Sequence, residues 1–254
     1  MAGKLYSLGG TDVGLMRAKN EDSMFVSDDP VGTLPNLYAV SDGMGGHNAG
    51  EVASREAVRH FVGRIRELSY GAEDYLDILV EGVSYANRKV FEMSLSDRRL
   101  RGMGTTFSAC SIAGGKIYIA HVGDSRVYMS SARGISQLTA DHTFVSEMIR
   151  AGGLTPEEAL IHEKRGVLTR AVGTSPEVQI DASVFELPEA CVILLCSDGL
   201  TNVLSDSHIQ SVLQSGDAEA MVSQLIAGAN ENGGPDNITA VVIQSRFDEG
   251  GVNL

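Results

Sequence analysis

Residues 37–46, which run Leu-Tyr-Ala-Val-Ser-Asp-Gly-Met-Gly-Gly, decide the fold of this 254-residue chain. The first four residues form a short apolar run rich in strand-forming side chains, and such a run predicts a buried β-strand. The strand leads directly into a glycine-rich turn that begins at Asp42. We therefore expect an acidic side chain at the end of a central strand, with small neighbours on either side.

The same pattern, an aspartate beside small residues where an apolar run ends or begins, recurs along the chain. Any one such acid is ordinary turn chemistry, because Asp caps turns and Gly adopts positive φ. The set is harder to explain in that way, since several strand ends can converge at one edge of a sheet. Asp198 and Asp236 share this pattern, Asp124 lies in a turn after Gly123, and Asp22 closes the segment that begins at Arg17.

Hydrophobic periodicity predicts the surrounding elements. Apolar residues recur at three- and four-residue steps over 51–68 and again over 76–93, which indicates two amphipathic helices. The stretch 141–170 is polar and partly helical, with a helix start at Thr155. Strands, then a helix pair, then more strands favour an α+β fold with antiparallel sheets over a doubly wound sheet. The later strands are expected at 105–112, 116–121, 126–129, 192–196 and 238–243.

Composition narrows the classes of protein. With no linker or repeat, residues 1–254 are expected to form a single domain. Lys and Arg number 20 against 33 Asp and Glu, and this net charge of −13 excludes a broad basic face for nucleic acid. No apolar stretch approaches 18 residues and no signal peptide is present, so we expect no membrane span. Three Cys without a C-x-x-C pair predict buried free thiols in a reducing compartment, so a cytoplasmic protein is expected. A monomer is expected separately.

Converging carboxylates need a partner, because close like charges resist ionising together. A hard divalent cation relieves that repulsion, and short Asp side chains suit octahedral oxygen coordination. No His and Cys ligand spacing is present, so magnesium or manganese is favoured over zinc. The carbonyl of Gly43, which no side chain covers, is a further candidate oxygen ligand.

Six short motifs in fixed order resemble those of the metal-dependent protein phosphatases of type 2C, the PPM family, in its bacterial branch. The resemblance extends from about residue 10 to about residue 243, nearly the whole chain. It implies a central β-sandwich of two antiparallel sheets flanked by helix pairs, with a flap subdomain at about 141–170. The motifs are Arg17-x-x-Asn20-Glu21-Asp22, Asp42-Gly43-Met44-Gly45-Gly46-His47, Gly104-Thr105-Thr106, His121-Val122-Gly123-Asp124-Ser125-Arg126, Ser197-Asp198-Gly199-Leu200 and Gly234-Pro235-Asp236-Asn237-Ile238-Thr239.

The resemblance also implies a role for each acid of the set. Asp42 resembles the catalytic carboxylate that bridges two metal ions, and the Gly43 carbonyl resembles a ligand of the second ion. Asp198 and Asp236 resemble the other ligands of the first ion. Asp124, together with Asp198, resembles the site of a third and weaker metal. The implied cofactors are two Mg²⁺ or Mn²⁺ ions, with room for a third.

Three residues near the N-terminus resemble supporting groups. Glu21 and Asp22 resemble acids that hold metal-bound waters, and Arg17 resembles the catalytic residue that grips the substrate phosphate. The implied reaction is hydrolysis of phosphoserine and phosphothreonine in proteins by a water or hydroxide that bridges the two metals. The reaction needs no covalent phosphoenzyme. The implied substrates are phosphoproteins made by a serine/threonine kinase.

One departure concerns the proton for the leaving group. Met44 stands where many eukaryotic relatives carry a His proposed as general acid, and Met cannot donate a proton. A metal-bound water is the preferred substitute, and His47 or His142 are alternatives for which a structural role is favoured. Arg126 is expected to hold Asp124 in place rather than to touch substrate.

Other functions stay open beside the phosphatase hypothesis. A catalytically silent relative acting as a regulatory binding protein is one, although such proteins usually lack a metal acid and none is missing here. Hydrolysis of a small phosphate ester is another. Cysteine and aspartyl phosphatase chemistry is excluded, because the chain has neither C-x₅-R nor D-x-D. The acidic surface is expected to favour basic phosphopeptides.

Overall fold

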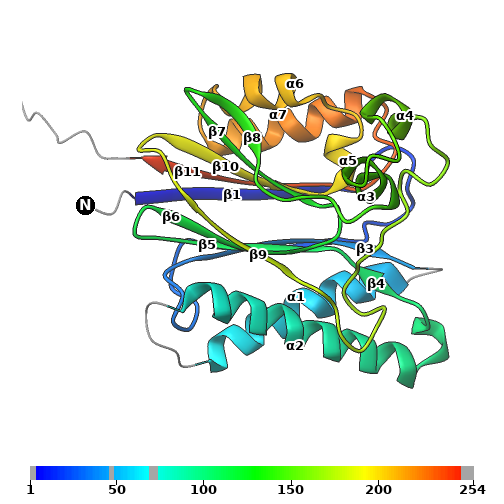
Figure 1. The fold of residues 1–254 in the computed structure, drawn as a ribbon. Coiled ribbons are helices and arrows are strands. Elements are labelled where there is room, and N and C mark those ends of the chain that lie inside the picture. Colours follow the sequence, from blue (N-terminus) through cyan, green and yellow to red (C-terminus); the bar gives the residue numbers. More distant parts are fainter. Residues whose placement is uncertain (1–3, 46–48, 69–73, 247–254) are drawn as a thin grey trace, which may run out of the picture.

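Two antiparallel β-sheets pack face to face between two layers of helices in the computed structural model, which describes residues 4–45, 49–68 and 74–246 (Figure 1). Every strand pairing in both sheets is antiparallel. The first sheet has the order β1 (Lys4–Asp12), β11 (Ile238–Arg246), β10 (Cys191–Cys196), β7 (Arg126–Ser131) and β8 (Gly134–Gln137). The second has the order β2 (Asp22–Ser27), β3 (Leu37–Met44), β5 (Phe107–Ala113), β6 (Lys116–Val122) and β9 (Asp181–Glu186), while β4 (Gly104–Thr105) pairs with β3.

Strand β3 shows how the alternation of side chains builds the layers. Tyr38 and Val40 point between the sheets, where they belong to a buried cluster that includes Leu195 of β10. Leu37 and Ala39 point the other way, into the cluster under the helices. Successive strand residues face opposite sides, so a strand buried on both faces is a continuous apolar run. This explains why residues 37–40 carry no charged side chain that could mark an exposed face.

Helices cover the outer face of each sheet. α1 (Ala49–Glu67) and α2 (Tyr75–Ser96) pack on the second sheet, and α6 (Asp206–Leu213) and α7 (Ala218–Glu231) pack on the first (Figure 1). This arrangement confirms the predicted α+β sandwich flanked by helix pairs. No helix in the described ranges is long and apolar enough to cross a membrane. The shorter helices are η1 (Arg98–Leu100), α3 (Phe144–Arg150), α4 (Pro156–Leu160) and α5 (Asp198–Thr201).

Most predicted elements are present with small shifts of their ends. The helix start at Thr155 is confirmed in detail, because its hydroxyl accepts from the Glu158 backbone and the Glu158 carboxylate accepts from the Thr155 backbone. The pattern did not indicate β1, whose apolar alternation is interrupted by Gly9 and Gly10. The elements not predicted from the sequence are β1, β2, β8, β9, η1, α5, α6 and α7.

Candidate active site

The acids predicted from the sequence meet at one end of the sandwich. Asp42 lies on β3, Asp124 in the turn between β6 and β7, Asp198 at the start of α5, and Asp236 just before β11. Together they line a cleft of about 260 Å³. The cleft is also lined by Arg17, Glu21, Met44, Thr106, Asn237 and the backbone of Gly43. Of the eight predicted site residues, only Asp22 is absent from this lining.

The backbone of Asp42 is fixed by two threonines of the Gly104-Thr105-Thr106 motif. The Asp42 carbonyl accepts from the Thr106 backbone at 2.9 Å and from the Thr105 hydroxyl at 2.7 Å, and the Asp42 N–H donates to the Thr106 hydroxyl at 2.9 Å. Both threonines are buried. The motif is recognisable in the sequence, but its pattern alone indicates no function. Its function here is to hold the aspartate's main chain rigid at the mouth of the cleft.

Two glycines allow the acid-bearing loops to approach one another. A Cβ on Gly199 would lie 2.0 Å from the Asn237 carbonyl oxygen, so a side chain there would push the Asp198 and Asp236 loops apart. A Cβ on Gly43 would lie 2.1 Å from the carbonyl oxygen of Gly50. From the sequence, the absence of a side chain at Gly43 is expected to expose its carbonyl. The structure adds that only glycine fits against the start of α1.

The segment from Arg17 to Asp22 is held against the cleft by Asn237. The Asn237 side chain accepts from the Glu21 backbone at 2.8 Å and donates to the carbonyls of Val13 and Lys19 at 2.9 and 2.8 Å. Arg17, in turn, donates to Asp236 at 2.7 Å. Asn237 was part of a recognised motif without a role, and the structure assigns it the positioning of the Arg17 segment.

Asp22 lies behind the cleft rather than on its wall. One carboxylate oxygen accepts from the hydroxyls of Ser197 at 2.7 Å and Thr239 at 2.6 Å. The other oxygen is buried and has no hydrogen-bond partner in the described part of the chain. An orphaned buried acceptor of this kind costs free energy unless a donor or a cation reaches it.

The acids strongly perturb one another. Burial, followed by the charges of Asp22, Asp198, Asp124 and Asp236, raises the pKa of Asp42 well above its ordinary value. Burial, reinforced by Asp198, raises the pKa of Asp124 to about 8. Burial also raises the pKa of Asp22 to about 6 and the pKa values of Asp198 and Glu21. Without a cation, this cleft therefore holds protons near neutral pH.

The donor set suits a hard divalent cation. No group of three or more His, Cys, Asp or Glu within residues 4–45, 49–68 and 74–246 is already spaced to close around an ion, so side chains must rotate for binding. The chemistry nevertheless fits, because the cleft offers carboxylate and carbonyl oxygens without thiolate or imidazole. The raised pKa values and the unpartnered Asp22 oxygen both indicate missing positive charge.

Comparisons with known proteins agree with this geometry. The family model of protein phosphatase 2C matches residues 17–239. This chain belongs to the protein phosphatase 2C family. It is 35% identical over 244 residues to the serine/threonine phosphatase stp of Listeria monocytogenes, covering 95% of this chain and 96% of that one. The predicted resemblance is thus confirmed, and the chain has the enzyme class of a serine/threonine protein phosphatase.

Solved structures of family members show the same fold. The serine/threonine phosphatase of S. agalactiae superposes with a TM-score of 0.89 at 35% identity, over 95% of this chain and 100% of that one. The catalytic domain of PstP, solved in complex with two manganese ions, gives a TM-score of 0.83 at 35% identity over 94% and 97%. These similarities show that family members with this fold include one that binds two metal ions.

In this phosphatase 2C chain, the segment 141–170 borders the cleft and is joined to the Asp124 turn by His142. Both backbone groups of Gly123 bond to His142, whose N–H donates to the Gly123 carbonyl at 2.8 Å and whose Nδ1 accepts from the Gly123 N–H at 3.0 Å. The Nε2 atom then faces Asp181 at 3.1 Å. His142 is fully buried, so it serves the structural role favoured for it from the sequence.

Two other predictions have different outcomes. Arg126 was expected to bond to Asp124, but it does not. Its guanidinium instead forms hydrogen bonds of 2.7–3.2 Å with Asp141 and one of 2.8 Å with the Tyr128 hydroxyl. That prediction was wrong, although a structural role for Arg126 is supported. His47, an alternative proton donor, lies outside the described residues. The buried free thiols Cys110, Cys191 and Cys196 are confirmed.

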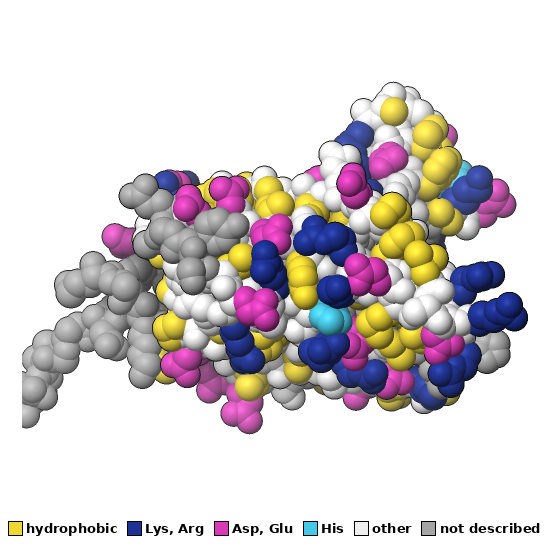
Figure 2. Space-filling model, turned by 90° about the horizontal axis from the view of Figure 1, so that it is seen from below, with side chains coloured by type: hydrophobic (Ala, Val, Ile, Leu, Met, Phe, Trp, Pro, Cys, Tyr) yellow, Lys and Arg dark blue, Asp and Glu magenta, His cyan; other side chains and the backbone are white. Residues whose placement is uncertain are grey.

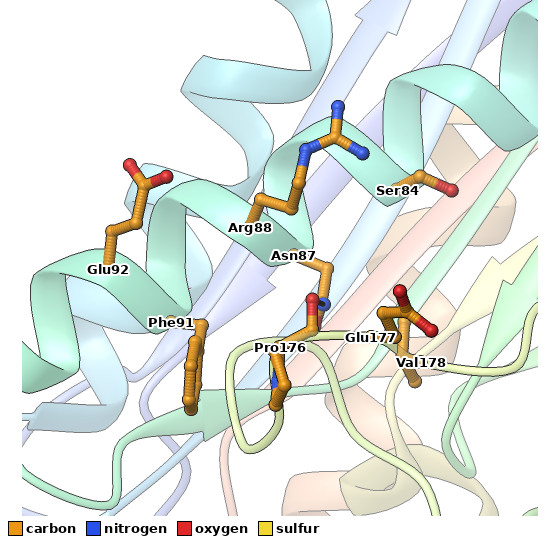
Figure 3. Close-up of a pocket in the computed structure, with 8 residues that line it drawn as sticks. All are labelled: Ser84, Asn87, Arg88, Phe91, Glu92, Pro176, Glu177 and Val178. Atoms are coloured by element: carbon orange, nitrogen blue, oxygen red, sulfur yellow. Dashed lines mark hydrogen bonds between the residues drawn. The ribbon is translucent and has the colours of Figure 1, made fainter.

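A second, larger hollow of about 550 Å³ lies away from the acids (Figure 3). It is formed between α2 and residues 176–178, and none of the predicted site residues lines it. Asn87 at its base donates to the carbonyls of Ser175 and Pro176 at 3.1 and 3.2 Å and accepts from the Gly173 N–H at 2.8 Å. This hollow therefore marks where α2 anchors the loop that follows the 141–170 segment.

Proposed function

We propose that this chain hydrolyses phosphoserine and phosphothreonine in proteins with two divalent metal ions, Mg²⁺ or Mn²⁺, held by its cleft acids. The observation that carries the proposal is the gathering of Asp42, Asp124, Asp198 and Asp236 on one cleft wall with Arg17. Such a set is costly for a fold without a cation, and it is the arrangement expected of a divalent-metal site.

The cleft acids would hold the metal ions, and Arg17 would hold the substrate. Asp42, Asp198, Asp236 and the Gly43 carbonyl would hold the two ions, and Asp124 with Asp198 would supply the weaker third position. Bound there, the ions supply an activated water and offset the charge that develops on the phosphoryl oxygens. Glu21 and Asp22 supply acceptors for waters at the back and side of the cleft.

Arg17 would bind the phosphate. Its guanidinium is half-exposed at the cleft and already bonds to Asp236, so it is positioned beside the proposed metal ligands. A planar guanidinium matches two oxygens of a phosphate monoester and stays charged at every working pH. Arg17 therefore orients the phosphoryl group toward the acids.

The described cleft wall has no free hydroxyl, thiol or imidazole side chain, and this favours water as the nucleophile. Its lining contains no Cys, Ser or His among the described residues, and its single hydroxyl, on Thr106, is bonded to the Asp42 backbone and to Ser125. The cysteines lie buried elsewhere, and burial raises the pKa of Cys191 to about 11 and that of Cys196 to about 12. These features support direct hydrolysis without a covalent phosphoenzyme. Met44 offers no proton for the leaving group, so bound metal would have to supply that acid function through its water.

We also propose that residues 141–170 act as a flap over the cleft, within one catalytic domain. Gly166 and Leu168 of this segment line the acid cleft, which supports the role. The same segment forms most of an adjoining hollow of about 370 Å³ that reaches Asp124 and Asp198.

We further propose a cytoplasmic monomer acting on the products of a serine/threonine kinase, and the three free thiols favour a reducing compartment.

A metal-depletion assay tests the proposed reaction. Chelator-treated protein should fail to hydrolyse a phosphothreonine peptide, and added Mn²⁺ or Mg²⁺ should restore turnover. Hydrolysis that persists without metal, or a stoichiometric phosphoenzyme trapped from labelled peptide, would contradict the mechanism. A silent regulatory relative would instead show no Mn²⁺ binding at millimolar metal by calorimetry, and a panel of metabolite esters against phosphopeptides tests the small-ester alternative.

A further inference from the structure

A short arginine-rich turn lies at the cleft end of the helix layer. Residues 98–101 are Arg-Arg-Leu-Arg, and all three arginines are exposed. Figure 2 views this helix layer from outside and shows Lys and Arg side chains gathered most densely toward one end of it. Three cations within four residues are unusual in a chain of net charge −13.

The turn is anchored rather than free. The Leu100 N–H donates to the Asp97 carbonyl at 2.9 Å, and the Met103 N–H donates to the Leu100 carbonyl at 3.1 Å. Leu100 packs against the helix-layer core, and Met103 is fully buried within it. Because its apolar residues are fixed in the core, the turn holds the backbone of its arginines in place while their side chains reach into solvent.

Two of the three charges lack a partner. Arg99 is neutralised by Asp97, whose carboxylate lies 2.6 Å from its guanidinium and also accepts from its backbone N–H at 2.9 Å. Arg98 and Arg101 have no ion pair with any described residue, whereas Arg55 of α1 and Lys89 of α2 are paired with glutamates of their own helices. Positive charge is therefore available at Arg98 and Arg101 alone in this turn.

This charge lies close to the catalytic strand. Arg101 is three residues before Gly104, so their Cα atoms are at most about 11 Å apart. Gly104 is the Cα partner of Met44 in the β4–β3 pairing, and Thr105 is that of Gly43. A peptide bound with its phosphate at the cleft needs to extend by only a few residues to reach the turn.

The charge of the whole chain is also segregated. Residues 49–101 contain nine Lys and Arg and nine Asp and Glu, so their formal charge is zero. The −13 resides entirely in the rest of the chain. An approaching acidic segment is therefore repelled by most of the surface and least by the helix layer that carries this turn.

We propose that Arg98 and Arg101 bind acidic side chains that flank the phosphorylated residue of a protein substrate. The inference rests on the proposed phosphatase function and specifies its substrates: phosphoproteins with Asp or Glu a few residues from the phosphosite, on the side that runs past β4. The general acidity of the surface favours basic peptides, whereas this turn reverses the preference on one side of the cleft. Exposed charge pairs are individually weak, so the expected gain is about three- to ten-fold in kcat/KM.

The test compares two phosphothreonine peptides that differ only by replacement of flanking Asp and Glu with Asn and Gln, assayed with Mn²⁺ at low salt. The double charge reversal Arg98→Glu, Arg101→Glu should lower kcat/KM about ten-fold for the acidic peptide, through KM. It should change turnover of the neutral peptide and of p-nitrophenyl phosphate less than two-fold. The effect should fade at high salt, because the contacts are exposed. Arg98→Lys with Arg101→Lys should keep the preference.

Arg66→Glu is the matched control, because Arg66 is also exposed and has no ion pair within the described ranges, but lies in the last turn of α1. An equal loss on both peptides, or the same loss from Arg66→Glu, would overturn the proposal. So would a wild type with no preference for the acidic peptide. A wild type that hydrolyses p-nitrophenyl phosphate but neither phosphopeptide would contradict the proposed function itself and the inference with it.

Discussion

Asp28 and Asp42 stand at opposite ends of the same β2–β3 hairpin, and their surroundings differ completely. Asp28 follows the far end of β2 and accepts three hydrogen bonds, from the Ser7 backbone at 3.2 Å, the Ser7 hydroxyl at 2.5 Å and the Tyr38 hydroxyl at 2.7 Å. Asp42 at the cleft end is surrounded by other acids, and its burial, followed by their charges, raises its pKa. One carboxylate is satisfied by donors, and the other is not.

The acid at the far end of the hairpin serves folding, whereas the acid at the cleft end serves the proposed function. At the far end, an acid completes the hydrogen bonding of the fully buried Tyr38 and so stabilises the fold. At the cleft end, the acids of four separate loops and strands are brought together at a cost that the fold alone does not recover. Such a cost is retained where a cation offsets it in the working enzyme.

Replacing the cleft acid should have the largest effect. Asp42→Asn should lower phosphatase activity by on the order of 10²–10³-fold or more, because the variant loses a carboxylate that would hold the metal ions. The measurement is kcat/KM on a phosphothreonine peptide with saturating Mn²⁺. The matched change Asp28→Asn should leave activity near wild type, and activity of Asp42→Asn near wild type would contradict the proposed role.

A buried neutral histidine should make the sandwich acid-labile. Burial, aided by His142 and opposed by Asp141 and Asp181, lowers the pKa of His121 from 6.5 to about 4. A group that stays neutral in the fold but titrates normally when unfolded contributes full stability above about pH 6.5. That contribution is lost as the pH falls toward 4, by up to about 3 kcal/mol.

Denaturant unfolding of the metal-free protein between pH 7 and 4, with NMR titration of the imidazole, measures this contribution. Protonation of the cleft carboxyls acts in the opposite direction over the same range, so the unfolding curves are compared between wild type and a His121→Asn variant. The difference between the two should shrink as the pH falls. A His121 ring that titrates near 6.5 in the folded protein would contradict the expectation.

At the far end, Asp28→Ala should destabilise the fold by about 1–3 kcal/mol, because it leaves the buried Tyr38 hydroxyl without its acceptor. Urea unfolding measures the change. The double variant Asp28→Ala, Tyr38→Phe should recover most of the loss, since no hydroxyl then remains to be satisfied. Phosphatase activity at a temperature where the variant is folded should stay within two-fold of wild type, and a large loss of activity would refute the separation of the two ends.

Arg17 should give the smallest effect if its charge is kept. Arg17→Lys should lower kcat/KM about ten-fold, because an ammonium cannot match two phosphate oxygens at once, and Arg17→Ala should lose more. Steady-state kinetics on the phosphopeptide measure both. Equal activity of the Lys and Ala variants would show that the guanidinium does not bind phosphate.

The sequence was sufficient to find the acids but not the groups that position them. Asp42, Asp124 and Asp198 each lie next to a glycine in a turn or at a strand end, and the other acids lie in short motifs, so all are marked by short-range features. The supports of Asp42 and Glu21 come from Thr106 and Asn237, which are distant along the chain, so their roles appear only in three dimensions. The wrong partner expected for Arg126 has the same origin, since Asp141 approaches it across a loop that the pattern does not locate.

The same limit applies to the fold. Continuous apolar runs predicted β10 and β11, because both faces of these strands are buried. Strand β9 alternates between half-buried and exposed residues, and β1 is interrupted by two glycines, so neither gave a clear apolar period. These strands form because neighbouring strands offer them hydrogen bonds, and this information is not contained within their own residues.

Thermal unfolding of wild type and Asp42→Asn, each with and without Mn²⁺, measures whether the cleft acids are held together for a metal. Without metal, Asp42→Asn should be the more stable protein by about 1–3 kcal/mol, because it removes a buried acid from among like charges. Mn²⁺ at about 100 times its Kd should raise the wild-type Tm by about 5–10 °C and that of the variant far less. A metal-free variant less stable than wild type, or equal Mn²⁺ shifts in both, would contradict the claim that these acids are held together for a metal.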